Sequence, residues 1–350
     1  MSPINTSFNR RNFAAVLACS AASAALPAIR VPPLAEKPKI FIAVAGKAAF
    51  DYLPLTVAEQ LGYFRAEGIE VEITDFASDA LALQAVSSGA AHVISGAYEH
   101  TIRLQSRGQK FQAFVLQGRA PAIAMGISPR NMPSYQSVVD LKDKKIGISA
   151  LGSSAHTVTH LILARAGLKA DQVNLMPVGT AGGALSALRS GQIDALCNVE
   201  PVITMLEQKG ELRIIADTRT LKGTLDVFGG PMPAGCLCAP LEFIQNNAHV
   251  IQAITYAMAR SLKWLQTAGP SDIIKTVPES YLLGDRALYL AAFNKVRESI
   301  SPDGMMPDVS PLNAARVLAR FDPAINAEKI ELSKTYTNQF ASIANERFKG

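Results

Sequence analysis

The chain has 350 residues, with 34 Lys and Arg against 29 Asp and Glu, a net charge of +5 and a hydrophobic fraction of 49%. This length suits one large or two medium domains, and the composition is that of a globular protein. Because the charge is modest and no dense Lys/Arg stripe occurs, we expect no nucleic-acid partner.

Residues 1–28 are predicted to be an export signal. Arg10 and Arg11 are followed by Phe13 and an Ala-rich apolar run, a pattern that resembles a twin-arginine leader. The alternatives are a basic disordered tail and lipid attachment at Cys19, which we disfavour because the apolar run before that cysteine is short. No later segment offers the ~20 uninterrupted apolar residues of a membrane span. We therefore expect a periplasmic protein, exported by the twin-arginine route.

Strands, loops and helices alternate in the same order in two successive parts of the chain. The stretch ALQAVSSG, which starts at residue 82, aligns without gaps on ALSALRSG, which starts at residue 184. Each is typical of a helix end, a Ser-Gly stop and a following apolar strand. The first part comprises residues 40–64, 71–77 and 82–99, and the second 146–168, 173–179 and 184–201. Both predict a βαβαβ unit, and hence an α/β fold of two lobes, each a mainly parallel sheet flanked by helices.

The remaining segments predict how the two lobes are joined. Residues 115–128 leave the first part, residues 233–240 return from the second, and the helices after Pro240 are expected to rejoin the first. Lobe 1 is therefore predicted to span residues 38–118 and 240–350, and lobe 2 residues 119–239. Two crossings make a hinge. Ligands gather beyond the carboxyl ends of parallel strands, so the strand-end loops of both lobes should enclose one cleft.

Cysteine spacing gives no sign of a metal site. Cys236 and Cys238 lie two residues apart, so on a strand they share a face and are poorly placed to bond each other. Together with Cys197 they are expected to be small buried side chains. We expect no metal and no cofactor.

Four motifs resemble a known family. They are PLTVAEQLGYFRAEGIEVE (54–72), SVVDLKDKKIGISALGSSAH (137–156), LSALRSGQIDAL (185–196) and VEP (199–201). They are similar to motifs of the substrate-binding proteins of ABC importers for nitrate, taurine and alkanesulfonates, over about residues 38–240. The resemblance implies a type II periplasmic-binding fold, joined by a two-crossing hinge, which closes on a small ligand and delivers it to permease subunits in the inner membrane. It also implies a monomer.

The strongest candidate site is the junction before residue 157. Gly152, Ser153, Ser154 and His156 lie where a strand-end loop enters a helix, and a helix N-terminus offers unpaired N–H groups and partial positive charge to an anion. Small residues let a ligand approach the backbone, and serine hydroxyls add donors. The alternatives are simple helix capping by serine and a solvent-facing histidine.

Other candidates lie in the equivalent loops. Glu200 could accept from a ligand amine or hydroxyl, or cap the next helix. Phe50 and Tyr52 could form an apolar wall of the site or pack beneath the first helix. Tyr98 could stack on a planar ligand or donate its hydroxyl, or it could cap locally. Ser78 and Glu99 could bind the ligand or cap a helix locally. These further candidates are Gly46, Phe50, Tyr52, Ser78, Tyr98 and Glu99.

The sequence predicts a binding protein without chemistry, which captures a small anionic or polar organic solute such as a sulfonate, taurine or nitrate. Asn198 and Val199 replace the aromatic-bearing stretch that the family usually has before Glu-Pro, so the ligand itself is left open. The alternative is an enzyme on the same fold, related to thiamine-pyrimidine precursor synthesis. The Cys-Leu-Cys of residues 236–238 is too sparse to resemble the cysteine-rich motif of those enzymes.

Overall fold

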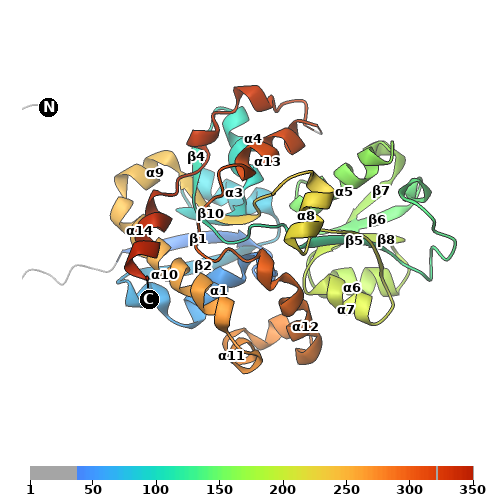
Figure 1. The fold of residues 1–350 in the computed structure, drawn as a ribbon, viewed down its shortest axis with the longest axis horizontal. Coiled ribbons are helices and arrows are strands. Elements are labelled where there is room, and N and C mark those ends of the chain that lie inside the picture. Colours follow the sequence, from blue (N-terminus) through green and yellow to red (C-terminus); the bar gives the residue numbers. More distant parts are fainter. Residues whose placement is uncertain (1–37, 321, 350) are drawn as a thin grey trace, which may run out of the picture. The chain divides into compact units, whose positions relative to one another are not determined.

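Two five-stranded sheets form the framework of the protein (Figure 1). The computed structural model describes residues 38–320 and 322–349, so the leader predicted for residues 1–28, with Cys19, lies outside the described residues. The first sheet has the order β2-β1-β3-β10-β4 and the second the order β7-β6-β8-β5-β9. The strands are β1 (Lys39–Ala45), β2 (Glu70–Phe76), β3 (Val93–Ala97), β4 (Phe111–Leu116), β5 (Ile123–Ile127), β6 (Lys145–Ile148), β7 (Asn174–Pro177), β8 (Ala195–Val199), β9 (Arg213–Asp217) and β10 (Gly235–Pro240).

Both sheets are mainly parallel with one reversed strand. In the first, β1 pairs in parallel with β2 and β3, and β10 runs antiparallel between β3 and β4. In the second, β6 pairs in parallel with β7 and β8, and β5 runs antiparallel between β8 and β9. The central strands β3, β5 and β8 are buried throughout, as expected for sheets covered on both faces. The predicted fold class is confirmed.

Helices cover both faces of each sheet. They are α1 (Leu53–Gln60), α2 (Tyr63–Ala66), α3 (Asp79–Ser87), α4 (Glu99–Ser106), α5 (Ser154–Arg165), α6 (Gly182–Arg189), α7 (Val202–Gln208), α8 (Leu221–Phe228), α9 (Leu241–Asn246), α10 (Ala248–Thr267), α11 (Pro270–Thr276), α12 (Arg286–Val296), α13 (Ser310–Ala319) and α14 (Gln339–Arg347). Figure 1 shows α3 and α4 on one face of the first sheet with α1 and α10 on the other, and α5 opposite α6 and α7 on the second.

The chain passes between the two sheets twice. It runs from β4 into β5 through residues 117–122 and returns from β9 to β10 through residues 218–234. After β10, α10 packs against α1, α2, α14 and β4, beside the first sheet, whereas α12 packs against α7, beside the second. The C-terminal part therefore contacts both halves, and the lobe boundaries at residues 118/119 and 239/240 stay a prediction.

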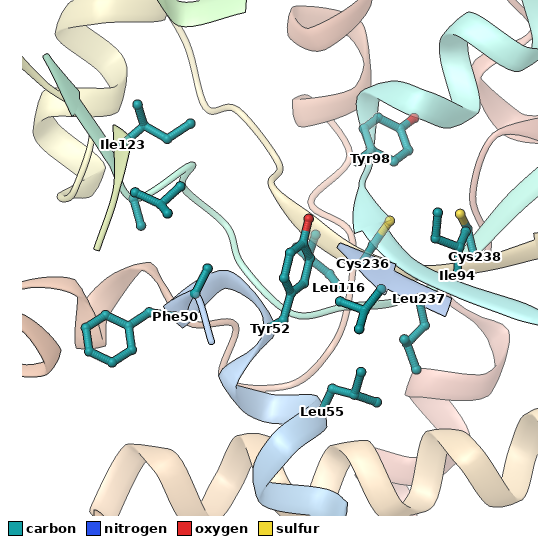
Figure 2. Close-up of a cluster of buried hydrophobic side chains, with 14 of the residues drawn as sticks. Phe50, Tyr52, Leu55, Ile94, Tyr98, Leu116, Ile123, Cys236, Leu237 and Cys238 are labelled. Carbon is teal, nitrogen blue, oxygen red and sulfur yellow. The ribbon is translucent and has the colours of Figure 1, made fainter. Parts of the chain in front are cut away.

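One large hydrophobic core surrounds the first sheet and continues between the second sheet and α5. A smaller core packs α6 and α7 against the other face of the second sheet. Figure 2 shows Leu55 and Leu237 on one face of the first sheet, and Ile94 with Cys238 on the other. Cys236 and Cys238 on β10 are buried in the large core as free thiols, and Cys197 is buried on β8, as predicted. Within residues 38–320 and 322–349, no helix is long and apolar enough to cross a membrane.

Candidate functional site

A cavity of about 210 Å³ lies between the strand-end loops of the two sheets. Its volume is below the ~300–1,000 Å³ of pockets for drug-sized ligands, so it suits a small solute. The loops after β1, β2, β6 and β7 line it together with the last residue of β8, at the carboxyl ends of parallel strands, where α/β sheets bind ligands. The lining residues are Ala45, Gly46, Ala49, Asp51, Tyr52, Asp75, Phe76, Ala77, Ser78, Asp79, Ser149, Ala150, Ser153, Ser154, Ala155, Gly179, Thr180 and Val199.

The loop after β1 is held by Asp75. The backbone N–H of Gly46 donates to the Asp75 carboxylate at 2.8 Å, and the N–H of Lys47 donates to it at 3.2 Å. Gly46 has φ +77°, and a Cβ at this position would lie 3.1 Å from Oγ1 of Thr180, in the loop after β7. A glycine is required by this backbone conformation, and its lack of a side chain lets the loops of the two sheets approach closely.

Two further carboxylates belong to the wall formed by the first sheet. Asp51 lies in the 3₁₀ turn Phe50–Tyr52, and Asp79 is the first residue of α3, which Ser78 caps by accepting from the N–H of Leu81 at 3.4 Å. Burial, with the nearby charge of Asp79, raises the pKa of Asp51 to about 8. Burial and the same carboxylates raise the pKa of Tyr52 well above its usual value, so its hydroxyl stays neutral.

The N-terminus of α5 forms the facing wall. The Ser153 hydroxyl caps this helix: it accepts from the N–H of His156 at 3.3 Å, accepts from Ser149 at 2.9 Å and donates to the carbonyl of Ala150 at 2.7 Å. The first helical residues, Ser154 and Ala155, also line the cavity. First-turn N–H groups have no acceptor within their own helix, so this wall supplies hydrogen-bond donors.

Five of the predicted site residues meet at this cavity, and six lie elsewhere. Gly46, Tyr52, Ser78, Ser153 and Ser154 line it. The residues outside its lining are Phe50, Tyr98, Glu99, Gly152, His156 and Glu200. Ser153 and Ser78 each cap a helix, which was the alternative to ligand binding. Both residues also line the cavity, so capping and ligand contact do not exclude each other.

Phe50 and Tyr98 pack in the core. The Phe50 ring contacts the rings of Tyr289 and Phe293 on α12 edge-on, with centroids 4.8 and 6.0 Å away. Tyr98 is fully buried, and its hydroxyl lies 2.6 Å from Oγ1 of Thr335 (Figure 2). Both side chains are therefore used for packing, which was the alternative for Phe50, whereas the alternative for Tyr98 was local capping.

Glu99 and His156 lie behind the cavity wall. The Glu99 carboxylate accepts from the hydroxyl of Thr157 on α5 at 3.3 Å. Nδ1 of His156 accepts from the N–H of Gly152 at 3.0 Å, and its Nε2 lies 2.8 Å from Nε2 of His160. Burial, followed by the charges of His160 and Arg103, lowers the pKa of His156 to about 4. The ring is therefore neutral at pH 7 and tied into its own helix.

Glu200 is fully buried in an ion network beside β9. Its carboxylate accepts from Nη1 of Arg219 at 2.9 Å and from the hydroxyl and N–H of Thr204 at 2.7 and 3.0 Å. Arg219 also donates to Asp217 and to Glu207. The capping alternative for Glu200 is thus seen in its bond to the N–H of Thr204, but its main partner is an arginine that sequence spacing does not reveal.

Three acidic residues of the cavity, Asp51, Asp75 and Asp79, were not among the predicted contacts. Asp75 and Asp79 flank Ser78, and Asp51 precedes Tyr52. Asp51 and Asp79 lie in predicted strand-end loops, and Asp75 lies near the end of the predicted strand 71–77. In these loops the sequence favoured hydroxyl and aromatic groups as contacts. The lining has three carboxylates and no Lys, Arg or His. Among the described residues, no group of His, Cys, Asp and Glu has an arrangement that could hold a metal ion.

Known proteins resemble this chain in sequence and in fold. The model of a family described as NMT1/THI5 like matches residues 49–270. A solved protein from Bordetella bronchiseptica RB50 is 51% identical, with a TM-score of 0.87 over 90% of this chain and 99% of that one. The alkanesulfonate-binding protein SsuA from Xanthomonas axonopodis pv. citri, bound to MOPS, is 17% identical, with a TM-score of 0.64 over 87% and 99% of the two chains.

The periplasmic nitrate-binding protein NrtA from Synechocystis PCC 6803 is 13% identical, with a TM-score of 0.68 over 90% of each chain. These likenesses to SsuA and NrtA show a shared two-lobed fold. The resemblance that the motifs in residues 54–72 and 137–201 predicted is confirmed by the family match together with this fold.

Proposed function

The chain belongs to the NMT1/THI5-like family, and on that basis we propose that it is the periplasmic solute-binding component of an ABC importer. It holds one small polar solute in the cavity between the sheets and delivers it to permease subunits in the inner membrane. The observation that carries this proposal is the cavity itself, because loops from both sheets line it at the ligand-binding edge of the fold. No catalytic step is part of the proposal.

Binding is proposed to work by closure of the two lobes around the solute. The two crossings, residues 117–122 and 218–234, are the segments in which a hinge can absorb the change. A solute that contacts both walls favours the closed arrangement, because its contacts are complete only there. The permease then distinguishes the closed, loaded protein from the open one.

The solutes named for the structural neighbours, alkanesulfonate and nitrate, give one version of this proposal, with an anionic group at the start of α5. Taurine would place its sulfonate there and its ammonium toward the first sheet. The three aspartates of the first-sheet wall oppose a solute that carries only negative charge. We therefore propose a polar solute and leave a purely anionic one as the less favoured case.

The test first identifies the bound solute and then fills the cavity from its α5 wall by a substitution. Native mass spectrometry of freshly purified protein should reveal a bound compound, and adding that compound at about 100 times its Kd should stabilise the fold by ~2.7 kcal/mol. Ser154→Phe fills the cavity from the first turn of α5 and should abolish this stabilisation. Ser271→Phe, in the first turn of α11 and exposed, is the matched control that should retain it.

Two results would contradict the proposal. Equal stabilisation of wild type and Ser154→Phe would remove the α5 wall from the site. Turnover of the bound compound would instead support the alternative of an enzyme on this fold, for which no residue of the cavity wall gives a reason at present.

A further inference from the structure

The ionisable side chains that line the cavity are all acidic. Its lining holds Asp51, Asp75 and Asp79 and no basic side chain. The Lys47 ammonium, on the loop after β1, is bound to Glu59 at 2.6 Å, and the Arg103 guanidinium donates to the Thr157 hydroxyl at 3.1 Å. Neither cation lines the cavity, so a solute that enters it meets three carboxyl groups on the wall of the first sheet with no basic side chain in the lining beside them.

Tyr52 supplies an independent sign of a ligand. Its side chain is buried, with 8% of the residue exposed, and it lines the cavity. Figure 2 shows its ring rising from the turn before α1 with the hydroxyl pointing away from Leu55. No described residue forms a hydrogen bond with this hydroxyl, although buried tyrosine hydroxyls usually have a partner. A solute in the cavity can provide that partner.

The carboxylates of Asp51 and Asp79 are also poorly satisfied. Asp51 has no hydrogen bond from any described residue, and the nearest basic atom to Asp79 is Nε2 of His100, at 3.9 Å. Asp75 differs, because it accepts the N–H groups of Gly46 and Lys47. Burial and the charge of Asp79 raise the pKa of Asp51 and so favour its protonated form. A cation placed between the two carboxyl groups favours the ionised form of both.

We propose that the solute is a small organic cation whose N–H groups bind Asp51, Asp79 and the Tyr52 hydroxyl. An ammonium or amidinium group has the donors for all three acceptors, since the phenol oxygen accepts as well as donates. The apolar lining, which includes Phe76 and Val199, suits a compact hydrocarbon body next to that group. This inference rests on the proposed function and specifies the charge of its solute.

The experiment compares small probes of different charge. Wild-type protein is titrated with n-propylammonium, acetamidinium, 1-propanol, propanesulfonate and nitrate, and binding is measured by thermal shift and calorimetry at neutral pH. We expect stabilisation by one or both cations and none by propanesulfonate or nitrate. The two cations distinguish an ammonium from an amidinium solute.

Asp79→Asn and Asp51→Asn should each weaken binding of the active cation by about tenfold or more, because a neutral amide replaces a carboxylate as its acceptor. Asp171→Asn, an exposed aspartate outside the cavity, is the matched control and should bind as wild type does. Asp79→Glu keeps the charge and is a second control. We expect it to have the circular dichroism spectrum of the wild type and to retain cation binding.

Stabilisation by propanesulfonate or nitrate but not by the cations would overturn the inference and leave the proposed function intact. The absence of any stabilisation by the two cations would overturn it as well. In that case the compound found by native mass spectrometry, and its dependence on Ser154, still decide the proposed function separately. Undiminished cation binding in both Asp51→Asn and Asp79→Asn would place the cation outside this wall and equally refute the inference.

Discussion

His156 and His160 are a pair of neutral rings at the start of α5. Burial lowers the pKa of His156 from 6.5 to about 4, and burial together with Arg103 also lowers the pKa of His160. Between about pH 6.5 and pH 4, His156 is therefore protonated in the unfolded chain but stays neutral in the folded chain. By linkage, the stability that the neutral ring contributes is complete above pH 6.5 and is lost as the pH falls toward 4.

His156→Gln should reduce this acid sensitivity. The melting temperature of the wild type should fall between pH 7 and pH 4, and the fall should be smaller in the variant because one of the groups that must stay neutral is gone. His249→Gln removes an exposed histidine and should keep the wild-type slope. Scanning calorimetry across this pH range measures both, and identical slopes in all three proteins would contradict the assignment.

The ion network around Arg219 stabilises the second sheet by joining elements that are far apart in sequence. Arg219 follows β9, Glu200 follows β8, and Glu207 lies on α7, where it also accepts from Lys295 of α12 at 2.7 Å. Burial raises the pKa of Glu200, and the Arg219 guanidinium opposes this rise. The arginine is therefore needed to keep a fully buried carboxylate satisfied.

Arg219→Met should lower the free energy of unfolding by about 3–5 kcal/mol, because it leaves Glu200 buried without its cation. Adding Glu200→Gln to that variant should recover part of the loss, since the uncompensated charge is then removed. Lys295→Met breaks only a partly exposed pair and should cost less than about 1 kcal/mol. Chemical denaturation distinguishes these values, and equal losses for Arg219→Met and Lys295→Met would refute the role of burial.

The same elements show what sequence patterns can and cannot predict. The repeat at residues 82–99 and 184–201 predicted helix, glycine stop and strand twice, and the chain forms α3, Gly89 and β3, then α6, Gly191 and β8. These features depend on local patterning and on left-handed glycines. The partners of Glu200 and Tyr98 depend on tertiary contacts, 19 residues away at Arg219 and 237 residues away at Thr335. No local pattern carries that information, so a polar loop residue looked the same whether it packed or bound a solute.

At the scale of the whole molecule, the proposed function requires the loops of the two sheets to approach each other when the lobes close on the solute. Gly46, in the loop after β1, and Thr180, in the loop after β7, approach each other closely, since a Cβ on Gly46 would lie 3.1 Å from the Thr180 hydroxyl oxygen. Gly62 has a similar left-handed backbone, with φ +69° against +77°, but a Cβ there would have no neighbour within 4 Å. An alanine at Gly62 would therefore test backbone strain alone, whereas an alanine at Gly46 would add a steric contact between the lobes.

Gly46→Ala and Gly62→Ala should each cost ~1–2 kcal/mol of stability, the penalty of a left-handed alanine. Only Gly46→Ala should also weaken solute binding, because its methyl group pushes the Thr180 loop away and hinders closure. Denaturant unfolding gives the first quantity, and calorimetry with the compound identified by mass spectrometry gives the second. If both variants bind the solute equally well, closure does not bring these two loops together, and the mechanism of binding by lobe approach must be replaced by binding to one wall alone.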